Sequence, residues 1–151
     1  MGNFTHFLDE YSRERYDIIS DMEEKHFQEW IELKEDLHSN KSNVKISEGE
    51  VWWCAIGENV GIEINGKSNF FSRPIIIVKK LSQFGFLAVP LTSQKHTGSW
   101  YASFDFKNKT QYAALAQIRV MSTSRLYRYI GTVPNSDLET VRDGLKKLYF
   151  D

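Results

Sequence analysis

The sequence of 151 residues is 41% hydrophobic and 14% aromatic, which suffices for the core of one domain with an appendage and excludes a disordered chain. No apolar run is long enough to span a bilayer, and the first ten residues, MGNFTHFLDE, are too polar and acidic for a secretory signal. We therefore expect a cytoplasmic protein with no membrane partner. The single cysteine, Cys54, cannot form an internal disulfide, and its apolar neighbours predict that it is buried.

The net charge of −1 conceals an uneven distribution. Residues 1–48 carry 12 acidic and 6 basic side chains, a net charge of −6, whereas residues 49–151 carry 8 acidic and 13 basic side chains, a net charge of +5. Opposite charges attract the two parts to each other, and the basic part favours a polyanionic partner, either RNA or an acidic protein.

The first part of the chain is predicted to be a helical extension. Residues 3–48 contain neither Gly nor Pro, and their apolar side chains come in stripes at helical spacing, the longest running from Phe27 through Trp30 to Leu37. We expect two helices or one bent helix, ending near residues 38–40. The polar cluster at residues 39–43 then separates an extension, residues 1–44, from a second domain, residues 45–151. The histidines of this region have no metal-ligand spacing, and no metal site is expected; they are His6, His26 and His38.

The second domain begins with strand patterns on either side of a long loop. Residues 46–56 read as a strand, and residues 57–69, with three glycines, read as a mobile loop of the kind that often carries binding residues. Two apolar runs follow, residues 75–78 and 86–89, and they predict paired strands. If these form a hairpin, Arg73 and Thr92 lie toward the same end of it.

The rest of the chain completes a mainly β domain. Strands are predicted over residues 99–106 and 112–120, and a short turn at 122–125 leads to a last strand over 126–130. Residues 135–137 offer an N-cap to a helix over residues 138–148, whose leucines and Val141 share one face. The core therefore reads as five or six strands and a C-terminal helix.

Several short segments of the second domain form a recognisable series. They are, in order, GEVWW at 49–53 with the glycine-rich loop after it, SRPIIIV at 72–78, PLTS at 90–93, AQIR at 116–119, SRL at 124–126 and IG at 130–131. Each segment is weak alone, but their order and spacing are hard to obtain by chance. Together they resemble the MazF/PemK (Kid) family, the toxins of type II toxin–antitoxin systems. The resemblance covers residues 48 to about 148 and leaves the N-terminal extension outside.

The resemblance implies a fold, an activity and partners. The implied fold is α+β and mainly β, an SH3-like small barrel of the CcdB/MazF type with a C-terminal helix. The implied activity is that of a homodimeric, sequence-specific endoribonuclease that cuts single-stranded mRNA without a metal or other cofactor. The implied partners are single-stranded RNA and a cognate antitoxin that blocks the RNA groove with an extended acidic tail.

By position in the motifs, Arg73 and Thr92 are the implied catalytic residues. Metal-free cleavage uses the 2′-hydroxyl as nucleophile and leaves a 2′,3′-cyclic phosphate, so the enzyme must stabilise a phosphorane and move two protons. Arg73 suits the phosphorane, because its planar guanidinium pairs with two oxygens and stays charged, and Thr92 can hydrogen-bond a phosphate oxygen or the 2′-hydroxyl. The residues predicted to bind RNA are Glu63, Ser72, Ser93, Gln94, His96, Gln117 and Arg119.

The proton acceptor stays open at this point among Glu58, Glu63 and His96. Ser122 stands where many relatives have Asp, and no histidine lies between residues 57 and 72 as it does in some. The aromatic side chains of the strands can stack on bases, although most are expected in the core or a dimer interface; they are Trp52, Trp53, Trp100 and Tyr101.

A different class of function is compatible with the same fold. The alternative is a non-catalytic binding protein, either a gyrase-directed poison of the CcdB branch or an inactive toxin-derived module. Two roles of residues 1–48 also stay open. In one role, the acidic segment lies over the basic domain and partly acts as an antitoxin in cis. In the other role, it extends the dimer interface.

Overall fold

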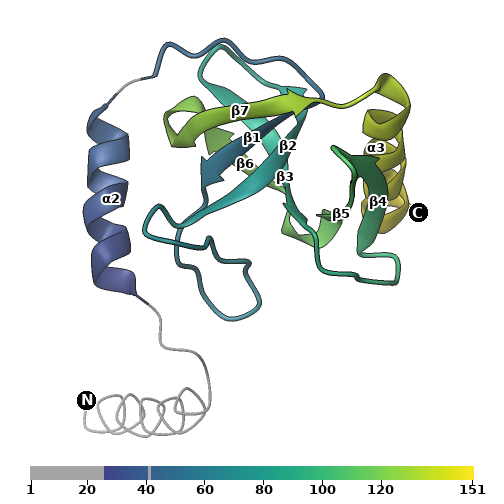
Figure 1. The fold of residues 1–151 in the computed structure, drawn as a ribbon, viewed down its shortest axis with the longest axis horizontal. Coiled ribbons are helices and arrows are strands. Elements are labelled where there is room, and N and C mark those ends of the chain that lie inside the picture. Colours follow the sequence, from purple (N-terminus) through teal and green to yellow (C-terminus); the bar gives the residue numbers. More distant parts are fainter. Residues whose placement is uncertain (1–25, 41) are drawn as a thin grey trace, which may run out of the picture.

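The computed structural model describes residues 26–40 and 42–151, in which an antiparallel sheet is flanked by two helices (Figure 1). His6 and the predicted apolar stripes before residue 26 lie outside the described residues. Helix α2 (Phe27–Ser39) stands at one side of the sheet and helix α3 (Asn135–Phe150) at the other. No helix in the described ranges combines the length and the hydropathy needed to cross a membrane.

The sheet has the strand order β4-β5-β3-β2-β1-β7, and β6 also pairs with β3. Every pairing is antiparallel, and the path of strands ends at β4 and β7 without closing on itself. The predicted mainly β fold with a C-terminal helix is thus confirmed, as an open sheet. The strands are β1 (Glu50–Ala55), β2 (Ser72–Lys80), β3 (Gly85–Thr92), β4 (Tyr101–Phe106), β5 (Lys109–Ala114), β6 (Arg119–Ser122) and β7 (Leu126–Thr132).

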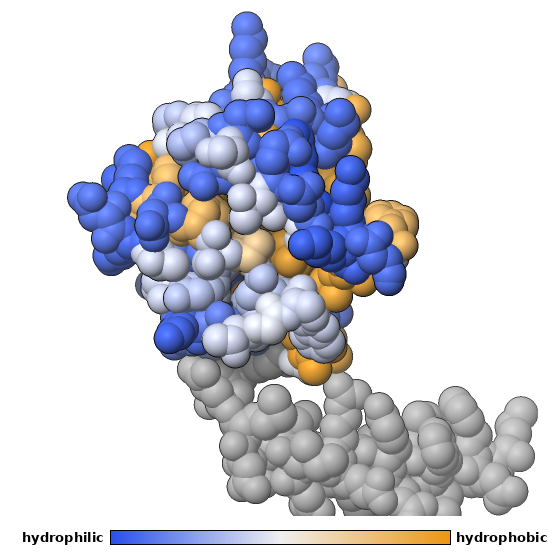
Figure 2. All heavy atoms as spheres, turned by 90° about the vertical axis from the view of Figure 1, so that its right-hand side faces the viewer, coloured by the Kyte–Doolittle hydropathy of each residue, from blue (hydrophilic) through white to orange (hydrophobic). Residues whose placement is uncertain are grey.

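The predicted central hairpin is present as β2 and β3, joined by a turn at residues 81–84. The β-branched run Ile75–Val78 is buried on both faces of the sheet, which explains why it shows no polar alternation. One face packs under α3 through Val89, Leu138 and Val141. The opposite face holds a second core cluster that includes Ile75, Phe86 and Met121. Figure 2 shows the α3 side of the molecule, where hydrophilic side chains cover most of the surface and hydrophobic ones form smaller patches.

The single strand predicted over residues 112–120 is wrong, because the chain makes a 3-10 turn at Leu115–Gln117 between β5 and β6. The register of β3 gives the reason. β5 pairs Leu91 with Ala113, whereas β6 pairs Ala88 with Arg119. The three residues of the turn are therefore inserted into what would otherwise be one ladder, and they bury Leu115 in the cluster beneath α3.

Two further boundaries differ from the sequence prediction. The first strand begins at Glu50, after Gly49 takes a left-handed φ of 88° and turns the chain, so residues 46–49 precede the strand. Helix α3 begins at Asn135, and its N-cap is Pro134 without a side-chain hydrogen bond, so the N-cap predicted at residues 135–137 is wrong. Helix α2, in contrast, ends where the polar cluster predicted it, at Ser39, and its Trp30 is buried.

Candidate functional site

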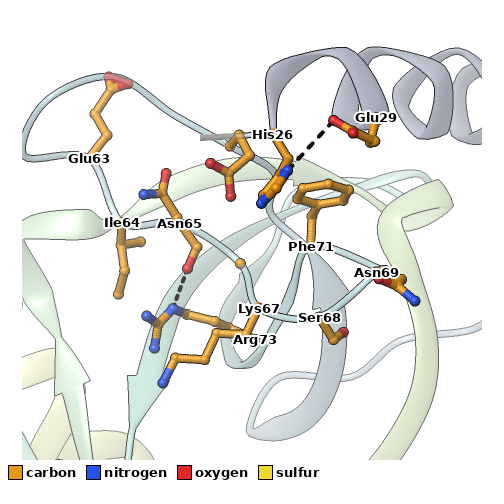
Figure 3. A pocket seen from close by; sticks show the side chains of 12 residues that line it. His26, Glu29, Glu63, Ile64, Asn65, Lys67, Ser68, Asn69, Phe71 and Arg73 are labelled. Carbon is orange, nitrogen blue, oxygen red and sulfur yellow. Dashed lines mark hydrogen bonds and ion pairs between the residues drawn. The ribbon is translucent and has the colours of Figure 1, made fainter. Parts of the chain in front are cut away.

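A pocket of about 1000 Å³ lies between the loop after β1, the start of β2 and the N-terminal end of α2. Five charged side chains line it, three carboxylates from Glu29, Glu58 and Glu63 and two cations from Lys67 and Arg73. Arg73, which the sequence predicted as a site residue, thus lies at the wall of a cavity. Figure 3 shows the ends of Lys67 and Arg73 pointing the same way, away from Glu29.

Arg73 is held by the loop that precedes it. Its Nε donates a hydrogen bond to the backbone carbonyl of Asn65, which fixes the plane of the guanidinium (Figure 3). The side chain is half-buried, and this burial lowers the pKa of Arg73 from its ordinary value. Arginine nevertheless keeps its proton at neutral pH, so the pocket contains an oriented cation.

The sheet places Thr92 at the same end of the β2–β3 ladder as Arg73. The last ladder pair at that end joins Ile75 to Pro90, and Arg73 and Thr92 each lie two residues beyond it. Because strand side chains alternate, Arg73 shares a face with Ile75, and Thr92 shares one with Ala88. Ile75 and Ala88 belong to the same core cluster, so both site residues lie on one face of the sheet.

The chain after β3 carries three more predicted residues, none of which lines the pocket. Thr92 Oγ1 accepts a hydrogen bond of 3.2 Å from the Gln94 backbone N–H, and Ser93 and Gln94 are exposed. His96 stacks on Tyr101 with ring centroids 4.3 Å apart and an interplanar angle of 6°. Its ring also lies edge-on to Tyr112, which is the ladder partner of Thr92. Tyr112 is therefore a neighbour of both His96 and Thr92.

Gln117 fastens the glycine-rich loop to the sheet. Its Oε1 accepts a hydrogen bond of 3.0 Å from the Ile64 N–H, and its Nε2 donates one of 2.9 Å to the Ile62 carbonyl. Asn59 spans the same loop, donating to the carbonyls of Ile56 and Ile64. The amide of Gln117, predicted to bind RNA, is thus committed to the loop that holds Arg73.

Two more arginines gather at the end of β1. Arg119 donates to the Ile56 carbonyl at 3.4 Å and Arg125 to the Ala55 carbonyl at 3.0 Å. Burial, and then the charge of Arg119, lower the pKa of Arg125. Cys54, which pairs with Arg73 across β1 and β2, is fully buried, and its burial raises the pKa of the thiol to about 12. Cys54 is therefore a neutral core residue, as its sequence context predicted.

Ser72 and the aromatic residues occupy varied surroundings. Ser72 is buried, and its hydroxyl is 2.8 Å from that of Tyr127. Trp52 Nε1 donates to Glu50, and the Trp52 ring packs against Tyr129. Trp100, in contrast, is exposed. In residues 26–40 and 42–151, no three His, Cys, Asp or Glu side chains form a group that would hold a metal ion.

Sequence reasoning missed three residues of this site. Asn65 acts through its backbone carbonyl, which leaves no trace in the side-chain pattern. Lys67 lines the pocket, and the signal for it was a cation inside a long glycine-rich loop. Arg125 was recognised as part of a motif, but its contacts with Ala55 and Trp30 depend on the tertiary fold.

The family model of the PemK-like, MazF-like toxin of type II toxin–antitoxin systems matches residues 47–149. The chain belongs to this family. The match includes every strand that the structure describes and all of α3 except its last residue, and it leaves α2 outside. It contains Arg73, Thr92, Gln117 and Arg119. A comparison with curated proteins gave no match.

Solved structures of this PemK/MazF family share the fold. MazF from Deinococcus radiodurans is 19% identical with a TM-score of 0.57, and the alignment covers 70% of this chain and 96% of that one. An endoribonuclease from a mycobacterial species, in complex with its cognate antitoxin, is also 19% identical, with a TM-score of 0.55 and coverage of 70% and 97%. At this identity the likeness concerns the fold. Each alignment leaves 30% of the present chain uncovered, which is enough to accommodate the N-terminal extension.

Proposed function

We propose that this member of the PemK/MazF family is an endoribonuclease toxin that cuts single-stranded RNA without a metal. The observation that carries the proposal is the position of Arg73. Its guanidinium is held by the Asn65 carbonyl at the wall of a pocket, at the same end and on the same face of the sheet as Thr92. A fixed cation suits the stabilisation of a phosphorane, and a hydroxyl on the same face can hydrogen-bond one of its oxygens.

In the proposed reaction the 2′-hydroxyl attacks the adjacent phosphorus, and the bond to the 5′-oxygen of the next nucleotide breaks. The products are a 2′,3′-cyclic phosphate and a free 5′-hydroxyl. Arg73 pairs with the phosphorane oxygens, whose negative charge grows in the transition state. Thr92 hydrogen-bonds a phosphate oxygen or the attacking hydroxyl, a role that needs no change in its own protonation.

The pocket favours a loop carboxylate as the proton acceptor. Glu58 and Glu63 line the same cavity as Arg73, whereas His96 does not line it and is stacked on Tyr101. The Val60 N–H donates to Glu63 Oε1 at 3.1 Å, which orients that carboxylate. The sequence left these three residues open, and the geometry supports the two glutamates.

The proposed partners follow from the family and from the charge of the domain. Single-stranded RNA contacts Arg73 and its surroundings, with Arg119, Ser93 and Gln94 as further contacts, and the cleavage is sequence-specific. A cognate antitoxin with an acidic tail competes for the same site, and the active form is a homodimer. Residues 1–44 form an extension to a catalytic domain of residues 45–151.

The test is cleavage of a mixed-sequence RNA in EDTA by the wild type and Arg73→Ala. Removing one group that stabilises transition-state charge costs about 10²- to 10³-fold in rate. The matched control is Arg128→Ala, which deletes an exposed arginine of β7. We expect the control to retain activity within about twofold, since phosphate contacts outside a site act mainly through general attraction. Absence of cleavage by the wild type refutes the proposal and favours a binding protein on the same fold.

A further inference from the structure

Helix α2 lies outside the region matched by the toxin family, yet it is docked on the candidate site by one buried side chain. Trp30 is 6% exposed and packs against Phe71, with ring centroids 5.7 Å apart. Leu33 and Leu37 cover the same small cluster, which also includes Ala55. Trp30 is thus the main apolar anchor of α2.

The residues around the Trp30 side chain belong to the family domain. Gly57 takes a φ of 93°, and a Cβ placed on it would lie 2.3 Å from Cε2 of Trp30. A side chain at position 57 would therefore exclude the indole ring. On another side, the Arg125 guanidinium lies 5.7 Å from the Trp30 ring while it donates to the Ala55 carbonyl. Gly57 and Arg125, from separate segments of the family domain, thus both contact the Trp30 indole.

The residues that contact Trp30 lie where the two ends of the loop that holds Arg73 meet, at Gly57 and Phe71, which we call the neck of the loop. The N–H groups of Ile56 and Gly57 both donate to the Phe71 carbonyl, at 2.9 and 3.0 Å, and close the loop. Gly66 donates to the Gly57 carbonyl at 2.8 Å, and its neighbour Asn65 accepts from Arg73. Trp30 therefore packs on the residues whose hydrogen bonds define where Asn65 sits.

Helix α2 contributes to the lining of the pocket. Glu29 of α2 faces a cavity whose other charged side chains, Glu58, Glu63, Lys67 and Arg73, come from the family domain. These four side chains carry two negative and two positive charges, and Glu29 adds one further carboxylate. Helix α2 thus forms one wall of the pocket, and its buried contacts are those of Trp30.

We propose that Trp30 is a positioning residue for the reaction. By docking α2 on the neck at Gly57 and Phe71, it holds the loop of residues 57–71 closed and keeps Arg73 in its reactive orientation. This inference rests on the proposed ribonuclease function. It makes the extension part of the catalytic apparatus rather than its inhibitor.

The test uses the full chain with Trp30→Ala, Trp30→Phe and, as control, Ile31→Ala, which shortens a side chain of the same helix that is 47% exposed. Two quantities are measured, hydrogen exchange of the amides of residues 57–71 and the cleavage kinetics. For Trp30→Ala we expect faster exchange in the loop with strands β2 and β3 still protected. Misplacing Arg73 lowers kcat by about 10- to 100-fold with little change in KM. Trp30→Phe keeps a ring against Phe71 and recovers most of the rate, and Ile31→Ala stays near the wild type.

Several outcomes overturn the inference. A rise of kcat in Trp30→Ala identifies α2 as an inhibitor, and unchanged exchange and kcat show that the docking has no effect on the loop. An equal loss in Ile31→Ala assigns the effect to general stability of the helix. If Trp30→Ala does not fold, Trp30→Leu takes its place, because leucine keeps an apolar side chain without a ring, and wild-type exchange and kcat in that variant refute the role. A wild type that cuts no RNA refutes the proposed function, and the exchange data then test the positioning of the loop separately.

Discussion

Replacing Gln117 by methionine tests whether the loop of the site is fastened to the sheet by this side chain. Methionine has a similar length and no amide, so the substitution removes the hydrogen bonds to Ile62 and Ile64 with little change in volume. Each such bond contributes a net of about 1 kcal/mol, so the loss of both favours local opening by about 2 kcal/mol. This corresponds to an increase of about 30-fold in the opening equilibrium, since 1.4 kcal/mol is a factor of about ten.

The assay is native-state hydrogen exchange, because it reports local opening separately from global unfolding. The Ile64 amide donates directly to Gln117 and is expected to exchange about 30-fold faster in Gln117→Met. The amides of Ile76 and Val89, in the core ladder, are expected to be unchanged. The control is Gln83→Met, at an exposed position of the β2–β3 turn. Exchange of the Ile64 amide at the wild-type rate would contradict the role of Gln117, and a loss of protection in the whole sheet would show that its effect is global.

Three further predictions concern the Cys54 thiol, the Glu48 carboxylate and the loop of residues 57–71. Cys54, buried and with a pKa of about 12, is expected to resist alkylation at pH 8 in the native protein and to react after unfolding; rapid native labelling contradicts its burial. The pKa of Glu48 is lowered in the folded protein, first by the Lys80 N–H, so its stabilisation is present above the ordinary carboxyl pKa and lost as the pH falls. Urea titrations should therefore show Glu48→Gln less stable by about 1 kcal/mol at pH 7, with a difference that shrinks as the pH falls below the ordinary carboxyl pKa, whereas a constant difference opposes this. Gly66→Ala places a Cβ 1.8 Å from the Phe71 carbonyl oxygen and should lower the free energy of unfolding by about 2 kcal/mol or more, measured by thermal unfolding. The control Gly61→Ala, with open space around it, should cost about 1 kcal/mol, and equal effects refute the close approach at Gly66.

The elements that depend on local pattern were predictable from the sequence. The β-branched run Ile75–Val78 and the apolar run Phe86–Val89 pair as the expected hairpin, and the Trp30 stripe forms a helix that packs on the domain. Arg73 and Thr92 were placed at one end of the hairpin by the same reasoning. Their roles came from the family resemblance, since a strand pattern carries no information about chemistry.

The features that depend on tertiary geometry were not predictable. The break at Leu115–Gln117 arises from the separate registers of β5 and β6 on β3, which no local pattern records. The Asn65 carbonyl that holds Arg73 is a backbone group, and any residue at position 65 would present one. The glycine at position 57 looked like loop composition, and only the docked Trp30 gives it a specific reason.

The central claim is that Arg73 and its loop form a site for metal-free RNA cleavage. The most direct measurement is the chemistry of the ends that the wild-type protein leaves on a single-stranded RNA in EDTA. The account predicts a 2′,3′-cyclic phosphate and a 5′-hydroxyl at a recurrent short sequence, formed about 10²- to 10³-fold more slowly by Arg73→Ala. A 5′-phosphate and a 3′-hydroxyl, or cleavage by Arg73→Ala at the wild-type rate, would contradict it.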